Sequence, residues 1–99
     1  MIRMPARRSK LDLVLGVLRA VRDGVDKPTR IMYAVNLSWK PTQKILDSLV
    51  GQGLLSESEE TGSRRSKKKY EITEKGVGVL RYFDGAQQLI DIDEFPSPD

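Results

Sequence analysis

The sequence predicts a small α+β domain of three helices, a two-stranded β-hairpin and a last helix. In the blocks around residues 11–21, 31–35 and 45–50, apolar residues recur at three- and four-residue steps, the period of a helix with one buried face. Two short runs, residues 54–58 and 68–72, instead alternate polar and apolar residues as strands do. A chain of 99 residues has room for one core of this kind.

The composition excludes several kinds of chemistry. The chain has no cysteine and no histidine, so disulfides, thiolate metal sites, thiol nucleophiles and imidazole bases are absent. Clustered carboxylates at catalytic spacing are also missing from the predicted helices and strands. No apolar run approaches the ~20 residues that span a bilayer. We therefore expect no enzyme activity, no catalytic residues, no cofactor, no metal and no membrane partner.

The first helix is predicted over residues 9–23. Ser9 and Asp12 have the spacing of a capping box, in which each side chain accepts a hydrogen bond from the other residue's backbone N–H. Gly24 follows as a left-handed end of the helix. The stripe expected to be buried is Leu11, Val14, Leu15, Leu18 and Val21.

A short second helix and a third helix follow with a connection of about three residues. Pro28 suits the first turn of the second helix, where its missing N–H is not needed. Ser38 is placed to cap the third helix, which begins at Trp39 and is stopped by Gly51 and Gly53. This spacing is that of a helix-turn-helix. The buried stripe expected on the third helix is Ile45, Leu46, Leu49 and Val50.

The hairpin carries a dense basic cluster. Five of the six residues from Arg64 to Lys69 are basic, and residues 59–63 before them are typical of a turn. Like charges crowded on one loop repel one another, so either solvent and salt tolerate the cluster or a polyanion binds there. The order of the predicted helices and strands and the positive charge of the hairpin together indicate a winged helix-turn-helix, with residues 59–67 as a basic wing.

The last helix is predicted over residues 73–92, with Thr73 as its N-cap. The domain is expected to span residues 9–92, between a basic tail at residues 1–8 and an acidic, proline-containing tail at residues 93–99. The stripe from Val77 through residue 90 either packs on the first helix of its own chain or pairs with a second copy. The residues expected at a homodimer interface are Leu80, Phe83, Gln87 and Ile90.

Residues 29–55, TRIMYAVNLSWKPTQKILDSLVGQGLL, and residues 70–80, YEITEKGVGVL, resemble the archaeal winged-helix proteins of the ArnR-like regulator and small chromatin-protein group. The resemblance covers roughly residues 9–83. It implies binding of double-stranded DNA, usually as a homodimer through the last helix.

In such a fold the third helix, residues 39–50, enters the major groove and the wing lies on the backbone or in the minor groove. A glutamine amide can pair with adenine, and lysines reach phosphate or guanine. Trp39 either lies against the DNA backbone or covers the core, and Lys69 is expected to be structural. The predicted DNA contacts are Trp39, Lys40, Thr42, Gln43, Lys44, Arg30, Arg64, Arg65, Lys67 and Lys68.

The function expected from these observations is that of a transcriptional regulator or small chromatin-associated protein, in a cytoplasmic, nucleoid-associated location. The alternative is a winged-helix module that binds other proteins in a transcription-related assembly. Basic residues on both the third helix and the wing favour DNA, because a protein-binding module does not need positive charge at both places.

Overall fold

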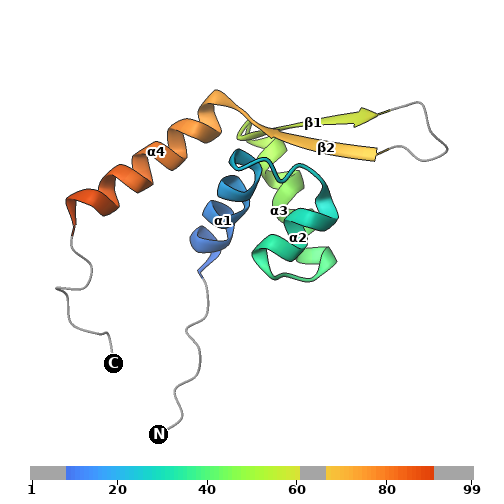
Figure 1. Cartoon of the computed structure of the whole chain (residues 1–99), viewed down its shortest axis with the longest axis horizontal. Coiled ribbons are helices and arrows are strands. Elements are labelled where there is room, and N and C mark those ends of the chain that lie inside the picture. The colour runs from blue at the N-terminus through green and yellow to red at the C-terminus, as the bar shows by residue number, and fades with distance from the viewer. Residues whose placement is uncertain (1–8, 61–66, 91–99) are drawn as a thin grey trace, which may run out of the picture.

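The computed structural model describes residues 9–60 and 67–90, except for the side chain of Glu60. In Figure 1 the first three helices form a bundle, and the hairpin and the last helix leave it in opposite directions. The predicted α+β winged helix-turn-helix is confirmed. The elements in order are α1 (Lys10–Arg22), α2 (Pro28–Val35), α3 (Trp39–Gly51), β1 (Leu55–Glu60), β2 (Lys67–Ile72) and α4 (Glu74–Leu89).

The ends of α1 and α4 have the caps that the sequence predicts. The Ser9 hydroxyl accepts from the Asp12 N–H at 3.0 Å, and the Asp12 carboxylate accepts from the Ser9 N–H at 3.2 Å. Gly24 follows α1 with a φ of 101°, in the left-handed region that glycine adopts without strain. At α4, the Thr73 hydroxyl accepts from the Gly76 N–H at 3.1 Å.

The start of α3 differs from the prediction in one respect. Ser38 has the extended backbone of an N-cap, but its side chain makes no capping hydrogen bond. Instead the Thr42 hydroxyl, one turn into the helix, donates to the Ser38 carbonyl oxygen at 2.9 Å. The Ser38 carbonyl oxygen therefore accepts from both the backbone N–H and the buried hydroxyl of Thr42.

One apolar core holds the three helices, the base of the hairpin and the first half of α4 together. Tyr70 of β2 and Leu80 of α4 lie in it, each 1% exposed. The Tyr70 backbone N–H donates to the Asp26 carbonyl oxygen at 2.9 Å, which fastens β2 to the connection between α1 and α2. The remaining core residues are Leu15, Val17, Leu18, Val21, Ile31, Val35, Leu46, Leu49, Leu54 and Leu55.

The hairpin is longer than predicted. The strands are antiparallel, with Leu55 opposite Ile72 at the base, and β1 continues through residues 59–60, which the sequence interpretation assigned to the turn. Opposite charges across the ladder explain the extension, because Glu59 lies opposite Lys68 and cross-strand pairs of opposite charge stabilise a sheet.

Candidate nucleic-acid interface

The outward face of α3 is the surface from which a binding site would be built. Leu46 and Leu49 point into the core, while Lys40 and Lys44 are exposed on the other side of the helix. Neither lysine forms an ion pair with another residue of the described chain. Both ammonium groups are therefore available to an external anion.

The predicted DNA contact at Thr42 is wrong. This side chain is 0% exposed and its hydroxyl is used within the helix. Position 42 lies one turn before Leu46, so it shares the buried face of α3. The sequence interpretation placed Thr42 outside because threonine is polar, but a β-branched side chain that satisfies its own hydroxyl is readily buried.

Trp39 and Gln43 occupy the side of α3 that faces the wing. The indole of Trp39 is 47% exposed and lies outside the core cluster, so it does not serve as a core cover. Gln43 is half-buried, and its side-chain nitrogen donates to the Asp47 carboxylate at 3.0 Å. Gln43 and Asp47 are four residues apart, about one helical turn, which places their side chains next to each other on the helix surface.

On the wing, the described lysines differ in their surroundings. Lys67 is exposed, whereas Lys68 is half-buried and pairs with the Glu57 carboxylate at 3.4 Å. The hydrogen bond and the charge of Glu57 raise the pKa of Lys68 above its usual value. The predicted contacts Arg64 and Arg65 lie outside the described residues.

The base of the wing and α3 meet at Tyr70. Burial raises the pKa of the Tyr70 hydroxyl, and the Gln43 side chain beside it offsets part of that effect. The contact falls short of a hydrogen bond of normal geometry, so the hydroxyl is buried without a partner among the described residues. Since a buried unpaired donor costs free energy, this hydroxyl is an unusual feature of the fold.

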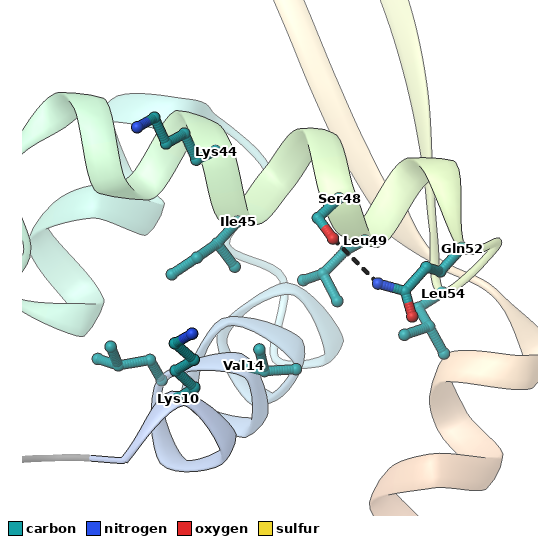
Figure 2. Close-up of a pocket in the computed structure, with 9 residues that line it drawn as sticks. Lys10, Val14, Lys44, Ile45, Ser48, Leu49, Gln52 and Leu54 are labelled. Carbon is teal, nitrogen blue, oxygen red and sulfur yellow. Dashed lines mark hydrogen bonds between the residues drawn. The ribbon is translucent and has the colours of Figure 1, made fainter.

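A hollow of about 530 Å³ opens on the opposite side of α3, between α3 and the start of α1. The residues that line it include Lys10 of α1 and Lys44 of α3, and Figure 2 shows Ile45 extending from α3 toward α1, where Lys10 and Val14 lie. Lys10 is absent from the predicted contacts. Its place in the capping-box segment, directly after Ser9, was the available signal, because this position fixes Lys10 in the first turn of α1.

Two further sets of predicted residues can be placed. Arg30 is exposed on α2 without an ion pair in the described part of the chain. Of the residues predicted at a dimer interface, Leu80 is wrong, because it is 1% exposed in the core of its own chain. Phe83 is half-buried against that core, and Gln87 and Ile90 are exposed.

The list of residues predicted at the dimer interface leaves out the two most exposed apolar residues of α4. Tyr82 is 74% exposed and Leu89 is 89% exposed. They are seven residues apart, so they lie on one face two turns from each other, with the small residues Gly78, Gly85 and Ala86 close to the same face. That seven-residue spacing was the signal in the sequence.

Two other features are absent from the described residues, a membrane-spanning helix and a metal-binding cluster. Over residues 9–60 and 67–90, no helix is long and apolar enough to cross a bilayer. In the same part of the chain, no cluster of three or more acidic, histidine or cysteine side chains could hold a metal ion.

Two archaeal proteins are similar to this chain in sequence. MJ0287, an uncharacterized protein of Methanocaldococcus jannaschii, is 33% identical over 70 residues, which cover 71% of this chain and 64% of that protein. MJ0290 of the same organism is 29% identical over 84 residues, 85% of this chain and 36% of that protein. The chain therefore spans less than two thirds of either relative.

Solved structures share the fold. Sso10a-2, a DNA-binding protein from Sulfolobus solfataricus, is 27% identical with a TM-score of 0.66, covering 83% of this chain and 81% of its own. The smu.1704 protein of Streptococcus mutans is 24% identical with a TM-score of 0.72, covering 87% and 85%. The zinc-responsive MarR family member ZitR of Lactococcus lactis is 18% identical with a TM-score of 0.63, covering 92% and 69%.

The sequence model of one family also matches nearly the whole chain. That model is described as winged helix-turn-helix and matches residues 7–91. The match includes all the helices and strands described above. The chain belongs to the winged helix-turn-helix family.

Proposed function

We propose that the protein binds double-stranded DNA as a transcriptional regulator or small chromatin-associated protein in the cytoplasm, at the nucleoid. The observation that carries the proposal is the exposed face of α3, where Lys40 and Lys44 stand without acidic partners in the described chain. An α-helix with such a face fits the major groove of B-DNA. Positive groups there neutralise phosphates and release counterions, which is the main source of affinity.

The two sides of α3 give this proposal a footprint. On one side the wing, with exposed Lys67 and the predicted contacts Arg64 and Arg65, would lie along the backbone or in the minor groove. On the other side Lys10 and Lys44 flank the hollow of Figure 2 and would meet the second strand's phosphates. Arg30 on α2 adds a further phosphate contact in the same scheme.

The comparisons support the proposal. Sso10a-2, at 27% identity, is a DNA-binding protein that covers most of this chain. ZitR is a member of the MarR family and shares the fold. A protein-binding role for this domain would not account for unpaired lysines on α3 as directly as DNA does.

The protein is further proposed to act as a homodimer through α4. The exposed apolar face of that helix contains Tyr82 and Leu89, and Ile90 at its end is 46% exposed. Because Leu80 and Phe83 face the core, the proposed pairing surface centres on Tyr82 and Leu89 and shares only Ile90 with the apolar residues predicted from the sequence. A twofold axis through this face would present two copies of α3 to the same DNA.

Fluorescence anisotropy with a labelled random-sequence duplex tests the DNA proposal. Binding at about 50 mM salt should weaken by roughly 10³-fold at about 200 mM, if six or more phosphates are contacted. The double variant Lys40→Ala/Lys44→Ala should bind much more weakly than wild type, whereas Arg81→Ala, which removes an exposed charge from α4, should not. Absence of binding by the wild-type chain at 50 mM salt would overturn the proposal and favour a protein partner.

A further inference from the structure

Asp47 is an exposed carboxylate on the same outward face of α3 as Lys40 and Lys44. In a DNA complex it would repel phosphates, so it lowers affinity. Among the described residues Asp47 makes no ion pair that would cancel its charge. Its hydrogen-bond partner is Gln43, one turn earlier on the helix, whose side-chain nitrogen donates to it at 3.0 Å.

The chemistry of this pair determines how the Gln43 amide is oriented. An ionised carboxylate accepts hydrogen bonds and cannot donate them, so the amide nitrogen, and not the oxygen, must face Asp47. The nitrogen carries two hydrogens. One is used by Asp47. The second N–H and the amide oxygen would be the donor and the acceptor that Gln43 presents to a base. That pair of groups is what adenine N7 and N6 require in the major groove.

Tyr70 bounds the same amide from the wing side. Its hydroxyl lies beside Gln43, is buried, and has no partner of normal geometry in the described chain. Glu57 and Lys68 of the hairpin and Asp47 of α3 also act electrostatically on this hydroxyl. Gln43 is thus enclosed between a carboxylate of its own helix and a buried phenol of β2.

We propose that Asp47 is a positioning residue for base recognition, which holds Gln43 in one of its two amide orientations and so determines which base is preferred. The inference rests on the proposed DNA binding of α3 and adds to it a specificity determinant. It also gives a role to the Asp47 carboxylate, whose charge weakens binding to DNA phosphates. Tyr70 limits the movement of Gln43 on the other side, so the base of the wing takes part in this positioning.

The test compares affinity for two duplexes, one selected by the wild-type chain from a randomised pool and a scrambled duplex of the same composition. Asp47→Ala should bind the scrambled duplex more tightly than wild type, because a repulsive charge is gone. The ratio of the two affinities should nevertheless fall by about fivefold or more, the smaller end of what one good base contact contributes. Asp47→Asn should also lower this ratio, because an asparagine side chain can donate a hydrogen bond and therefore permits the opposite orientation of the Gln43 amide.

Two controls separate positioning from charge and from helix stability. Glu71→Gln removes an exposed carboxylate from β2 and should leave the ratio unchanged. Ser48→Ala removes a comparable side-chain hydrogen bond five residues further along, in which Gln52 donates to the Ser48 hydroxyl at 2.9 Å, and should also leave the ratio unchanged. Gln43→Ala should lower the ratio as Asp47→Ala does, and the double variant should lower it no further.

The outcomes distinguish this inference from the proposed function. If wild type binds no duplex, DNA binding itself fails and the inference fails with it. If wild type binds every duplex equally, DNA binding stands and the positioning role is overturned. The same conclusion follows if the Asp47 variants change both affinities by one factor and so leave their ratio unchanged, as Glu71→Gln is expected to do. A lower affinity ratio in both Asp47 variants, with the folded far-ultraviolet spectrum retained, supports the positioning role.

Discussion

The Arg19 guanidinium donates to the Asp84 carboxylate at 2.9 Å, which joins α1 to α4 across 65 residues of sequence. Arg22 reaches the second oxygen of the same carboxylate at 3.5 Å. These side chains are about one third exposed, so solvent screens the attraction in part. The triad lies beyond Leu80, the last core residue of α4. The triad therefore adds a polar contact between α1 and α4 next to the apolar contact that Phe83 makes with the core.

Replacing Asp84 with alanine should destabilise the fold by about 0.5–1 kcal/mol, because both arginines lose their partner but remain partly solvated. The measurement is the urea unfolding midpoint. Asp23→Ala is the matched control, since the Asp23 carboxylate pairs with Arg22 at 3.2 Å and is more exposed. A smaller effect of Asp84→Ala than of Asp23→Ala would contradict the role assigned to the triad.

Gly76 and Gly78 of α4 should respond in opposite directions to alanine. A Cβ on Gly76 would overlap the Leu54 carbonyl oxygen and the Ile72 side chain, whereas nothing lies within 4 Å of a Cβ on Gly78. Gly78→Ala should therefore raise the free energy of unfolding by up to about 1 kcal/mol, the helix-propensity difference. Gly76→Ala should lower it by about 1–3 kcal/mol, as overpacking does. Equal shifts in thermal unfolding would rule out the close approach.

The Tyr70 hydroxyl is expected to cost stability at neutral pH. It is buried without a partner in the described chain, so Tyr70→Phe removes an unsatisfied group and should stabilise the protein by about 1 kcal/mol. Chemical denaturation at pH 7 measures the difference. Destabilisation by the phenylalanine would show that the hydroxyl has a partner, such as a bound water.

The same residue predicts a pH dependence. Burial raises the Tyr70 pKa in the folded state above its ordinary value of 10.0. The unfolded tyrosine therefore ionises first, and stability present below pH 10 is lost as the pH rises through the folded value. The raised pKa of Lys68 acts in the same direction in wild type. The difference between wild type and Tyr70→Phe in urea midpoint, at pH 8 and near pH 11, should isolate the tyrosine, with the steeper decline in wild type.

The predictable parts of this fold are those in which local chemistry decides. The capping box at Ser9, the left-handed Gly24 and the cap at Thr73 follow from side chains within three residues of each helix end. Thr42 was misplaced although it lies four residues before Leu46 on the same face of α3, because a polar residue type was given more weight than the helical spacing. The length of the hairpin was also underestimated, since Glu59 belongs to a strand through its partner Lys68 across the ladder.

Sequence reasoning placed the residues of the candidate site that lie together on one helix, but not those brought together from two helices. Lys40 and Lys44 are exposed on α3 as expected. Lys10, by contrast, lines the same hollow as Lys44 although the two residues are 34 positions apart, a relation that no local pattern records. Likewise Leu80 and Tyr82 are two positions apart on α4, but tertiary packing alone decides which of them is buried.

Self-association through α4 should depend on Tyr82 and Leu89. Charged substitutions at both positions, Tyr82→Glu/Leu89→Glu, should produce a monomer in sedimentation velocity at micromolar concentration, because a buried pair of carboxylates opposes its copy across the axis. Tyr33→Glu is the matched control: Tyr33 is a 76% exposed aromatic residue on α2. A wild-type chain that sediments as a monomer would contradict the dimer.

Lys10 and Lys44 should contribute to DNA affinity as two phosphate contacts on the side of α3 away from the wing. Each alanine substitution should weaken binding to all duplexes similarly and reduce the slope of log affinity against log salt by about one, as loss of one released counterion requires. The pair should be nearly additive if each lysine meets its own phosphate. Arg81→Ala, which removes an exposed charge from α4, should leave the slope unchanged. If Lys44→Ala alone lowers the slope, the DNA backbone does not cross the hollow in Figure 2, and the footprint ends at α3.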